Sequence, residues 1–145
     1  MGEIYEQLVS ILGSSERDGS LQKATWVLGD QPEIDEGRSS CFYFWPSWNI
    51  QIVFDKRAQL FKELVFHFPC DEKGQIASQQ SSQIEFLHRI SQNDSPAEVQ
   101  QKIKLTPRTS IRAGDHWEVY QVAHTHITFV FDQMGRMLLV YVSYG

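Results

Sequence analysis

An internal repeat constrains this fold more than any other feature, because residues 19–68 and 94–142 run through the same order of elements. Each copy reads as a short capped helix, a Pro-containing loop, an aromatic strand, a strand that ends in Phe-Asp, a turn and an apolar strand. The corresponding landmarks are Ser20 and Ser95, Pro32 and Pro107, residues 50–55 and 127–132, and Leu60 and Met137. Pro32 and Pro107 are 75 positions apart and Phe54 and Phe131 are 77 apart, which a two-residue loop insertion explains. Four landmarks in one order indicate duplication.

Hydrophobic alternation with a period of two predicts three strands in each copy. It is clearest in residues 48–55, where Ile50, Ile52 and Phe54 share one face with Trp48. The predicted strands are 40–45, 48–55 and 60–68 in the first copy, and 117–122, 125–132 and 137–144 in the second. Short turns separate them, so each copy predicts a three-stranded antiparallel meander. The acidic residues 30–40 are expected to form a loop.

Apolar residues at helical spacing predict a short helix at each of three places. One helix is expected over residues 3–12, before Gly13, and a second around Ala24 and Trp26, ending at Gly29. The third begins with the capping box of Ser95 to Glu98, with Pro96 at the first helical position, and ends at Thr106-Pro107. Residues 69–93 are expected to be a linker, with a possible helical turn at 84–90.

One repeat of about 50 residues buries too little apolar surface to be stable alone. The two copies must therefore share a core, which makes residues 1–145 a single domain. The predicted fold class is α+β: two units of a short helix plus a three-stranded antiparallel meander, forming one sheet of about six strands. The helices are expected on one face, with the other face partly open.

This unit resembles the repeat of the β-lactamase inhibitor protein and of the SmpA/OmlA outer-membrane assembly lipoproteins. The residues that carry the resemblance are Ser95-Pro96-Ala97-Glu98-Val99, Pro107, Trp117-Glu118-Val119-Tyr120, Phe129-Val130-Phe131-Asp132 and Gly135, with Gly29-Asp30-Gln31-Pro32 as the loop of the first copy. In the second copy, Lys104-Leu105-Thr106-Pro107 lacks the loop glycine. The resemblance covers about two-thirds of the chain and implies a curved sheet whose open, aromatic face binds protein.

Composition narrows the function classes. The chain has 13 Lys+Arg, 18 Asp+Glu and a net charge of −5, which argues against a basic nucleic-acid-binding face and favours a basic partner. No apolar stretch approaches the ~20 residues that span a bilayer, so no membrane partner is expected. The chain opens without a secretory signal, so we expect a cytoplasmic protein in which Cys41 and Cys70 stay reduced, with Cys41 in the core.

The sequence does not favour catalysis or metal binding. His116, His124 and His126 lie within eleven positions, but spacing fixes no third ligand, so a polar strand face is the preferred interpretation. The chain offers no nucleophile elbow and no phosphate-binding Gly-rich loop. We therefore expect no catalytic residue, no metal site and no cofactor.

The expected site is instead a partner-binding surface built from tryptophans and acids. Trp45 is the candidate exposed anchor in the first copy, whereas Trp48 and Trp26 are expected to be buried. Trp117 is the equivalent in the second copy. The acidic residues and flanking positions assigned to this surface are Asp30, Glu33, Asp35 and Glu36, and Asp115, His116 and Glu118.

Three hypotheses of function remain open. The first is a non-catalytic inhibitor, an immunity protein that neutralises a cognate bacterial toxin, with a basic toxin domain as its partner. The second is a ligand-binding or enzymatic α+β domain whose pocket lies between the two meanders, with the histidines as its polar groups. The third is an assembly scaffold without a toxin.

Overall fold

The structure is a computed structural model in which residues 2–15, 17–68 and 84–144 are described. Its helical elements are short: α1 (Gly2–Val9), α2 (Arg17–Leu28), the 3₁₀ turn η2 (Leu87–Arg89) and α3 (Pro96–Ile103). The predicted linker falls largely on residues 69–83, which lie outside the described residues together with Cys70. Cys41 is fully buried, which confirms its expected place in the core.

The strands form one antiparallel sheet across the described chain. They are β1 (Glu33–Glu36), β2 (Ser40–Trp45), β3 (Ile50–Asp55), β4 (Leu60–His67), β5 (Arg108–Arg112), β6 (Asp115–Val122), β7 (Thr125–Phe131) and β8 (Met137–Tyr144). They form a single eight-stranded sheet in the order β1-β2-β3-β4-β8-β7-β6-β5. The expectation of about six strands in a balanced α+β fold is therefore wrong: this part of the chain is rich in sheet, and its helices are few and short.

The two missed strands, β1 and β5, are the edges of the sheet. Every residue of both strands is exposed, so neither has the alternation that identified the inner strands. β1 was expected to be an acidic loop, but it pairs with β2 from Glu33 opposite Phe44 to Glu36 opposite Cys41. An edge strand with polar residues on both faces carries little sequence signal, because neither face has to enter a core.

A helix followed by a four-stranded meander occurs twice, and the two meanders join through their last strands. At this seam β4 and β8 run antiparallel, with Val65 directly opposite Tyr141. Leu64 faces Val142 and Phe66 faces Val140, so the pairing is symmetric about that central pair. The arrangement is that of two similar halves related by an approximate two-fold axis at the seam.

Phe54 and Phe131 occupy matching places in the two halves. The register shifts between Val53 and Phe54 in one hairpin and between Val130 and Phe131 in the other. Phe54 then pairs with Phe61 and Phe131 with Met137, one position from the expected match of Leu60 with Met137.

The aspartate after each phenylalanine closes its turn. Asp55 Oδ1 accepts hydrogen bonds from the backbone N–H groups of Arg57 (2.9 Å) and Ala58 (3.2 Å). Asp132 Oδ1 accepts them from Met134 and Arg136, each at 2.9 Å. The bond from Ala58 is the largest of the contributions that lower the pKa of Asp55. Burial alone would raise the pKa of Asp132, but the bonds from Arg136 and Met134 outweigh burial and lower it.

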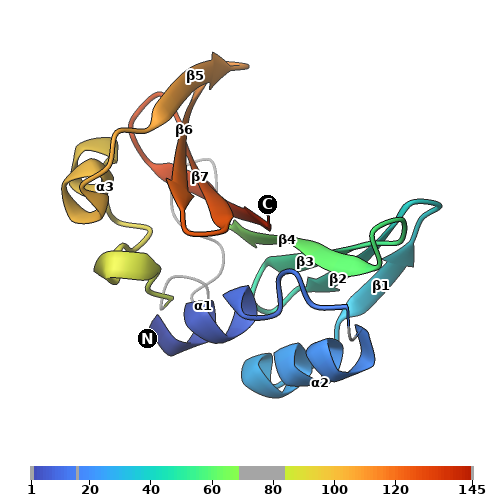
Figure 1. Ribbon diagram of the computed structural model, residues 1–145. Helices are drawn as coiled ribbons and strands as arrows, with labels where there is room; N and C mark the ends of the chain where they lie inside the picture. Colours follow the sequence, from blue (N-terminus) through green and yellow to red (C-terminus); the bar gives the residue numbers. More distant parts are fainter. Residues whose placement is uncertain (1, 16, 69–83, 145) are drawn as a thin grey trace.

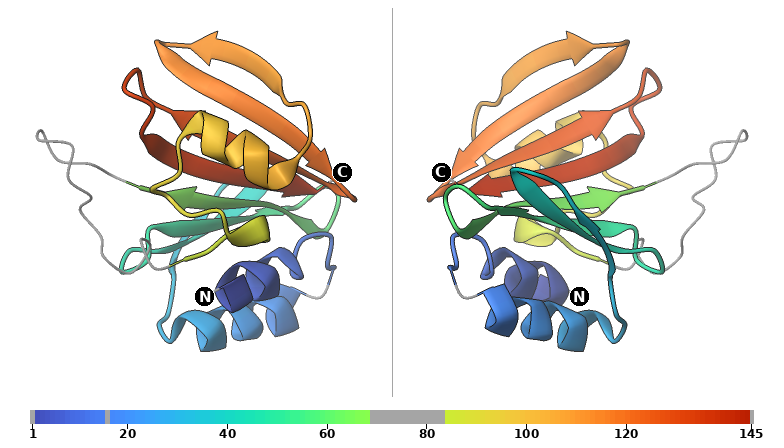
Figure 2. Two further views of the ribbon diagram at one scale, coloured as in Figure 1. Left: turned by 90° about the vertical axis from the view of Figure 1, so that its left-hand side faces the viewer. Right: turned by 90° about the vertical axis from the view of Figure 1, so that its right-hand side faces the viewer.

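The helices cover one face of the sheet, and no helix or strand of the described residues covers the other face, as the two views of Figure 2 show. In Figure 1 the sheet bends around its uncovered face, with β1 and β5 at its two ends. The core lies between the helices and the covered face, where the largest fully buried side chains are aromatic. These include Trp45, Tyr43, Tyr120, Phe54, Phe61, Phe66, Phe68, Phe86, Phe129 and Phe131.

The buried side of α2 differs from the expected one. Ser20, Ala24 and Leu28 are buried at i, i+4 and i+8, whereas Trp26 is 79% exposed. The prediction that Trp26 is buried is wrong. Trp26 comes two residues after the buried Ala24, and residues two positions apart lie on opposite sides of a helix. The capping box of α3 is confirmed: Ser95 Oγ accepts from the N–H of Glu98, and Glu98 Oε1 accepts from the N–H of Ser95.

Candidate functional site

The candidate site is the uncovered face of the sheet, here called the open face. One row of directly paired residues crosses all eight strands on this face and is called the central row. In order from β1 to β5 it comprises Glu33, Phe44, Gln51, Val65, Tyr141, Thr128, Val119 and Arg108. Its middle is mostly apolar or aromatic and its ends carry opposite charges. The approximate two-fold axis maps the row onto itself, so Glu33 and Arg108 occupy matching positions.

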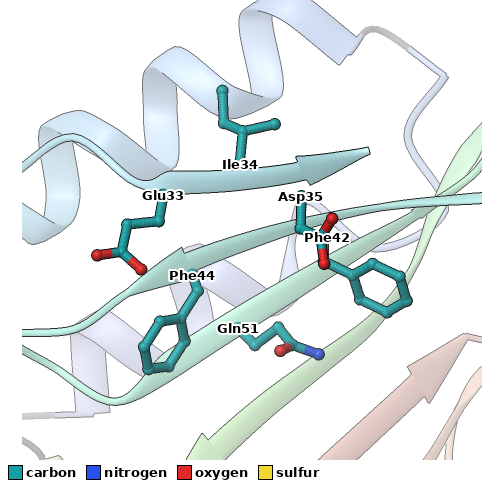
Figure 3. A pocket seen from close by; sticks show the side chains of 6 residues that line it. All are labelled: Glu33, Ile34, Asp35, Phe42, Phe44 and Gln51. Atoms are coloured by element: carbon teal, nitrogen blue, oxygen red, sulfur yellow. The ribbon is translucent and has the colours of Figure 1, made fainter. Parts of the chain in front are cut away.

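The acidic end of the open face contains a pocket of about 430 Å³ (Figure 3). The carboxylates of Glu33 and Asp35 lie beside the rings of Phe44 and Phe42, and Gln51 closes the inner side. Glu33 and Asp35 are exposed and form no ion pair with another described residue. Two carboxylates over two partly exposed rings offer both charge and apolar contact to a partner that carries Lys or Arg.

The other end of the open face is basic. Arg112 places its guanidinium 4.5 Å from the centre of the Trp117 ring, a cation–π contact. Trp117 is half-buried, lies opposite Val130, and matches Phe42 of the first half. The open face therefore carries opposite charges at its two ends: it is acidic at β1 and basic at β5.

Tyr141, near the centre of the row, lies close to Glu63 of the neighbouring strand. Burial is the main cause that raises the pKa of Tyr141, and the interaction with Glu63 raises it further.

The structure places some of the sequence-predicted residues on the open face and separates them into two groups. Glu33 and Asp35 lie at the β1 end, and Trp117 and Asp115 near the β5 end. Glu36 faces the opposite way and pairs with Lys56 at 3.1 Å. The two predicted groups therefore lie at opposite ends of the open face.

Asp30 lies outside the sheet, in the exposed loop after α2. Its side chain accepts hydrogen bonds from the backbone N–H of Gln31 at 2.8 Å and from Ser47 Oγ at 3.4 Å. These contacts give Asp30 a role in closing the loop, beside the first predicted group.

Trp45 is not an exposed anchor, and that prediction is wrong. Its side chain is fully buried, and its indole N–H donates to the backbone oxygen of Asp30 at 2.9 Å. The reason is its position in β2: Trp45 pairs with Ile50, so it shares the helix-covered face with the core residues of β3. Trp48 lies in the turn before β3 and is half-buried, and its indole donates to the oxygen of Leu28 at 2.9 Å.

Glu118 and His116 are on the covered face. Glu118 is 1% exposed, so its expected place on an exposed surface is wrong, whereas the His116 side chain is 37% exposed. The Oε2 of Glu118 lies 2.8 Å from His116 Nε2 and 3.4 Å from Gln100 Nε2 of α3, and its Oε1 accepts from Tyr120 at 2.9 Å. Burial is the main cause that raises the pKa of Tyr120, and this bond adds to it. Alternate residues of β6 thus form a polar cluster that reaches from the core to its edge.

The three histidines do not converge. His116 points to the covered face, His124 lies in the turn before β7, and His126 pairs with Gln121 on the open face. Among the described residues, no three His, Cys, Asp or Glu side chains come together in a group that could hold a metal ion.

Several open-face residues were not singled out from the sequence. They are Phe42, Phe44, Gln51, Tyr141, Arg108 and Arg112. The alternation in residues 40–45 could have identified the first two, because Phe42 and Phe44 must share a face if Cys41 is in the core. The two arginines could not have been found, since β5 has no periodic pattern.

His67, on the open face near the seam, predicts a pH effect on stability. Burial lowers the pKa of His67 in the folded protein. As the pH falls, His67 therefore becomes charged in the unfolded chain first, while it is still neutral in the folded protein. Stability is therefore complete above about pH 6.5, the usual pKa of histidine, and falls as the pH drops below it. Urea unfolding at pH 7.5 and 5.5 should show a smaller acid loss for His67→Gln than for the wild type. Equal losses would contradict this.

Comparisons with known proteins concern the fold. No model of a known family matches the sequence, and no curated protein matches it. Two solved structures are similar: an extracellular protein containing a SCP domain from Bacillus anthracis (10% identity, TM-score 0.61, 97% of this chain and 46% of that one) and a DUF4309 family protein, YjgB, from Bacillus subtilis (13%, 0.54, 98% and 93%). The chain thus spans about half of the first structure.

Neither of these proteins is described as an inhibitor or an immunity protein, so the resemblance and the toxin hypothesis stay predictions. No helix in the described part of the chain has the length and apolar character needed to cross a bilayer. At these identities the likeness carries no function, and the chain is similar to both proteins in its fold.

Proposed function

We propose that this protein is a non-catalytic protein-binding domain and that the open face is its binding surface. The observation that carries the proposal is the central row: its inner residues are mostly apolar or aromatic, the rings of Phe44 and Tyr141 are partly exposed, and no described element covers them. Partly exposed rings offer large contact area at low entropic cost, which is why aromatic residues dominate protein interfaces. A sheet fixed on one side by the core presents these rings in a preorganised arrangement.

The same geometry argues against a pocket between the meanders, the second hypothesis from the sequence. β4 and β8 hydrogen-bond directly at the seam, from Glu63 opposite Ser143 to His67 opposite Leu139. The two halves therefore share a continuous sheet, which leaves no gap between β4 and β8. A pocket of about 380 Å³ does lie on the covered side, between α1 and the β6–β7 turn, and His124 is the one histidine in its lining. The polar cluster around Glu118 lies beneath α3, on the covered face, which favours a structural role for it.

Within this proposal, the partner is a basic protein, and a toxin domain neutralised by an immunity protein is the specific case. Support comes from Glu33 and Asp35, which are exposed, have no ion-pair partner among the described residues and border an aromatic pocket. The net charge of −5 adds long-range attraction for a basic protein and speeds encounter. If this protein binds across the catalytic centre of a toxin, it inhibits the toxin by covering that centre.

Affinity capture from a lysate of the source organism tests the proposal. The wild type should retain one partner at near-equal stoichiometry, identified by mass spectrometry. Phe44→Asp replaces a partly exposed ring of the central row with a charge and should weaken binding by at least about 30-fold, the size of a 2 kcal/mol hot spot. If the partner is a toxin, its activity should fall to zero at equal molar amounts.

Met134→Asp is the matched control, because Met134 is 80% exposed in the turn between β7 and β8, away from the central row. It should bind like the wild type, and thermal unfolding should show that both variants are folded. Equal capture by Phe44→Asp and the wild type would refute the proposed surface. A purified protein that turns over a small molecule, with activity lost on changes to the histidines, would refute the non-catalytic role.

A further inference from the structure

The two edge strands of the sheet are complementary to each other. β1 and β5 are the first and last strands, so the outer backbone groups of each face no strand of the described chain. All of their side chains are exposed. Unpaired edges of this kind are templates for another strand.

The apolar residues of the two edges match. Ile34 in β1 is 63% exposed and Ile111 in β5 is 76% exposed, and both are among the most exposed large apolar side chains described. Ile34 pairs with Tyr43 and Ile111 with His116, so both point to the helix-covered side of the sheet. An isoleucine at the centre of each edge is costly to leave in water unless another surface covers it.

The charged residues of the two edges match as well, on the other side of the sheet. Glu33 and Asp35 of β1 point to the open face, and so do Arg108 and Arg112 of β5. The acids have no ion-pair partner among the described residues, and Arg112 rests on Trp117. One edge is therefore acidic and the other basic, on one and the same face.

Strand direction allows the two edges to join. Neighbouring strands alternate in direction across the eight-stranded sheet, so β1 and β5 run in opposite directions. Placing β1 of a second copy beside β5 of the first therefore continues the antiparallel order. In this arrangement the open faces of the two copies lie on the same side.

We propose that a second copy of this chain is the partner of each edge, with β1 of one copy added to β5 of the next. In the register that matches all these features, Ile34 lies opposite Ile111 and Glu33 opposite Arg112. Asp35 then lies opposite Ser110, between the two arginines. The contact is head-to-tail, so it leaves one free edge at each end and extends into a chain of copies.

The size of the contact sets its strength. Strands of four and five residues bury little surface, so association is weak, depends on concentration and weakens as salt screens the charges. Such a chain would present several open faces side by side, which raises the avidity for a partner with repeated sites. The inference goes beyond partner binding and stands or falls independently of it.

Charge reversal gives a decisive test by sedimentation velocity of the full-length protein. The wild type should grow in weight-average mass with concentration, past the dimer. E33R/D35R makes both edges basic, and R108E/R112E makes both edges acidic, so each variant alone should stay monomeric. Mixed at equal amounts, the two variants should assemble again, because each then supplies the edge that the other lacks.

E3R/E6R is the control for E33R/D35R, since it makes the same change in net charge on exposed residues of α1 and should assemble like the wild type. Circular dichroism should show that all variants are folded. A wild type that stays monomeric at millimolar concentration would overturn the proposal and leave the edge charges as protection against association. A mixture that does not assemble would overturn it too, as would single variants that assemble normally.

Discussion

Replacing Phe66 with alanine is expected to lower the free energy of unfolding by about 3 to 5 kcal/mol, the usual cost of removing a fully buried aromatic ring. Phe66 is fully buried in β4 and lies opposite Val140 at the seam. The centre of its ring lies 5.0 Å from that of Phe86, with the two rings edge-on, and 6.0 Å from that of Tyr5 in α1, with the two rings tilted. One side chain thus joins the seam between the halves to the helical layer. Chemical denaturation of the purified variant measures the loss.

Phe42→Ala is the matched control, because it removes the same ring from the half-buried open face. It should cost less than half as much as Phe66→Ala, since part of the Phe42 ring remains in water. Equal costs for the two variants would contradict the assignment of covered and open faces.

Glu118→Ala is expected to destabilise the protein by about 3 kcal/mol, from an unsatisfied buried group plus a small cavity. Removing the carboxylate leaves the buried Tyr120 hydroxyl without its acceptor at 2.9 Å, and His116 without its partner at 2.8 Å. The first half has Tyr43 at the matching position, so the polar cluster belongs to the second half alone. Urea unfolding gives the difference directly.

Glu118→Gln separates charge from hydrogen bonding. The amide oxygen can still accept from Tyr120, so this variant should retain more stability than Glu118→Ala. Partner capture by both variants should be unchanged at a temperature where they are folded, because the cluster faces the core. Loss of capture by a folded Glu118→Gln protein would show instead that the cluster belongs to the binding surface.

The inner strands could be predicted from the sequence because each has one face in the core. Ile50, Ile52 and Phe54 alternate with smaller or polar residues, and this pattern located all of β3, although the predicted strand began two residues too early, at residue 48. The number of strands could not be predicted, because β1 and β5 are stabilised by backbone pairing to a neighbour and not by burial. Sequence patterns report burial, so elements without it are missed.

The tryptophans show why site prediction was less successful than strand prediction. Trp45 lies in β2 on the same face as Cys41 and Tyr43, so its burial depends on which face of that strand enters the core. A shift of one residue in a strand exchanges its two faces. Trp26 shows the same dependence on phase in a helix, since Ala24 and Leu28 define the buried side. The predicted acids of the first copy are exposed, but Glu118 is buried, and the basic end of the face was not foreseen.

Site-specific photo-crosslinking to the captured partner tests the central claim most directly. A benzophenone amino acid replaces one glutamine at a time: Gln51 or Gln121 on the open face, or Gln22 or Gln101 on the exposed sides of α2 and α3. The account predicts crosslinked partner from the two open-face positions and none from the two helical positions. Crosslinks from Gln22 or Gln101, with none from Gln51 and Gln121, would contradict it.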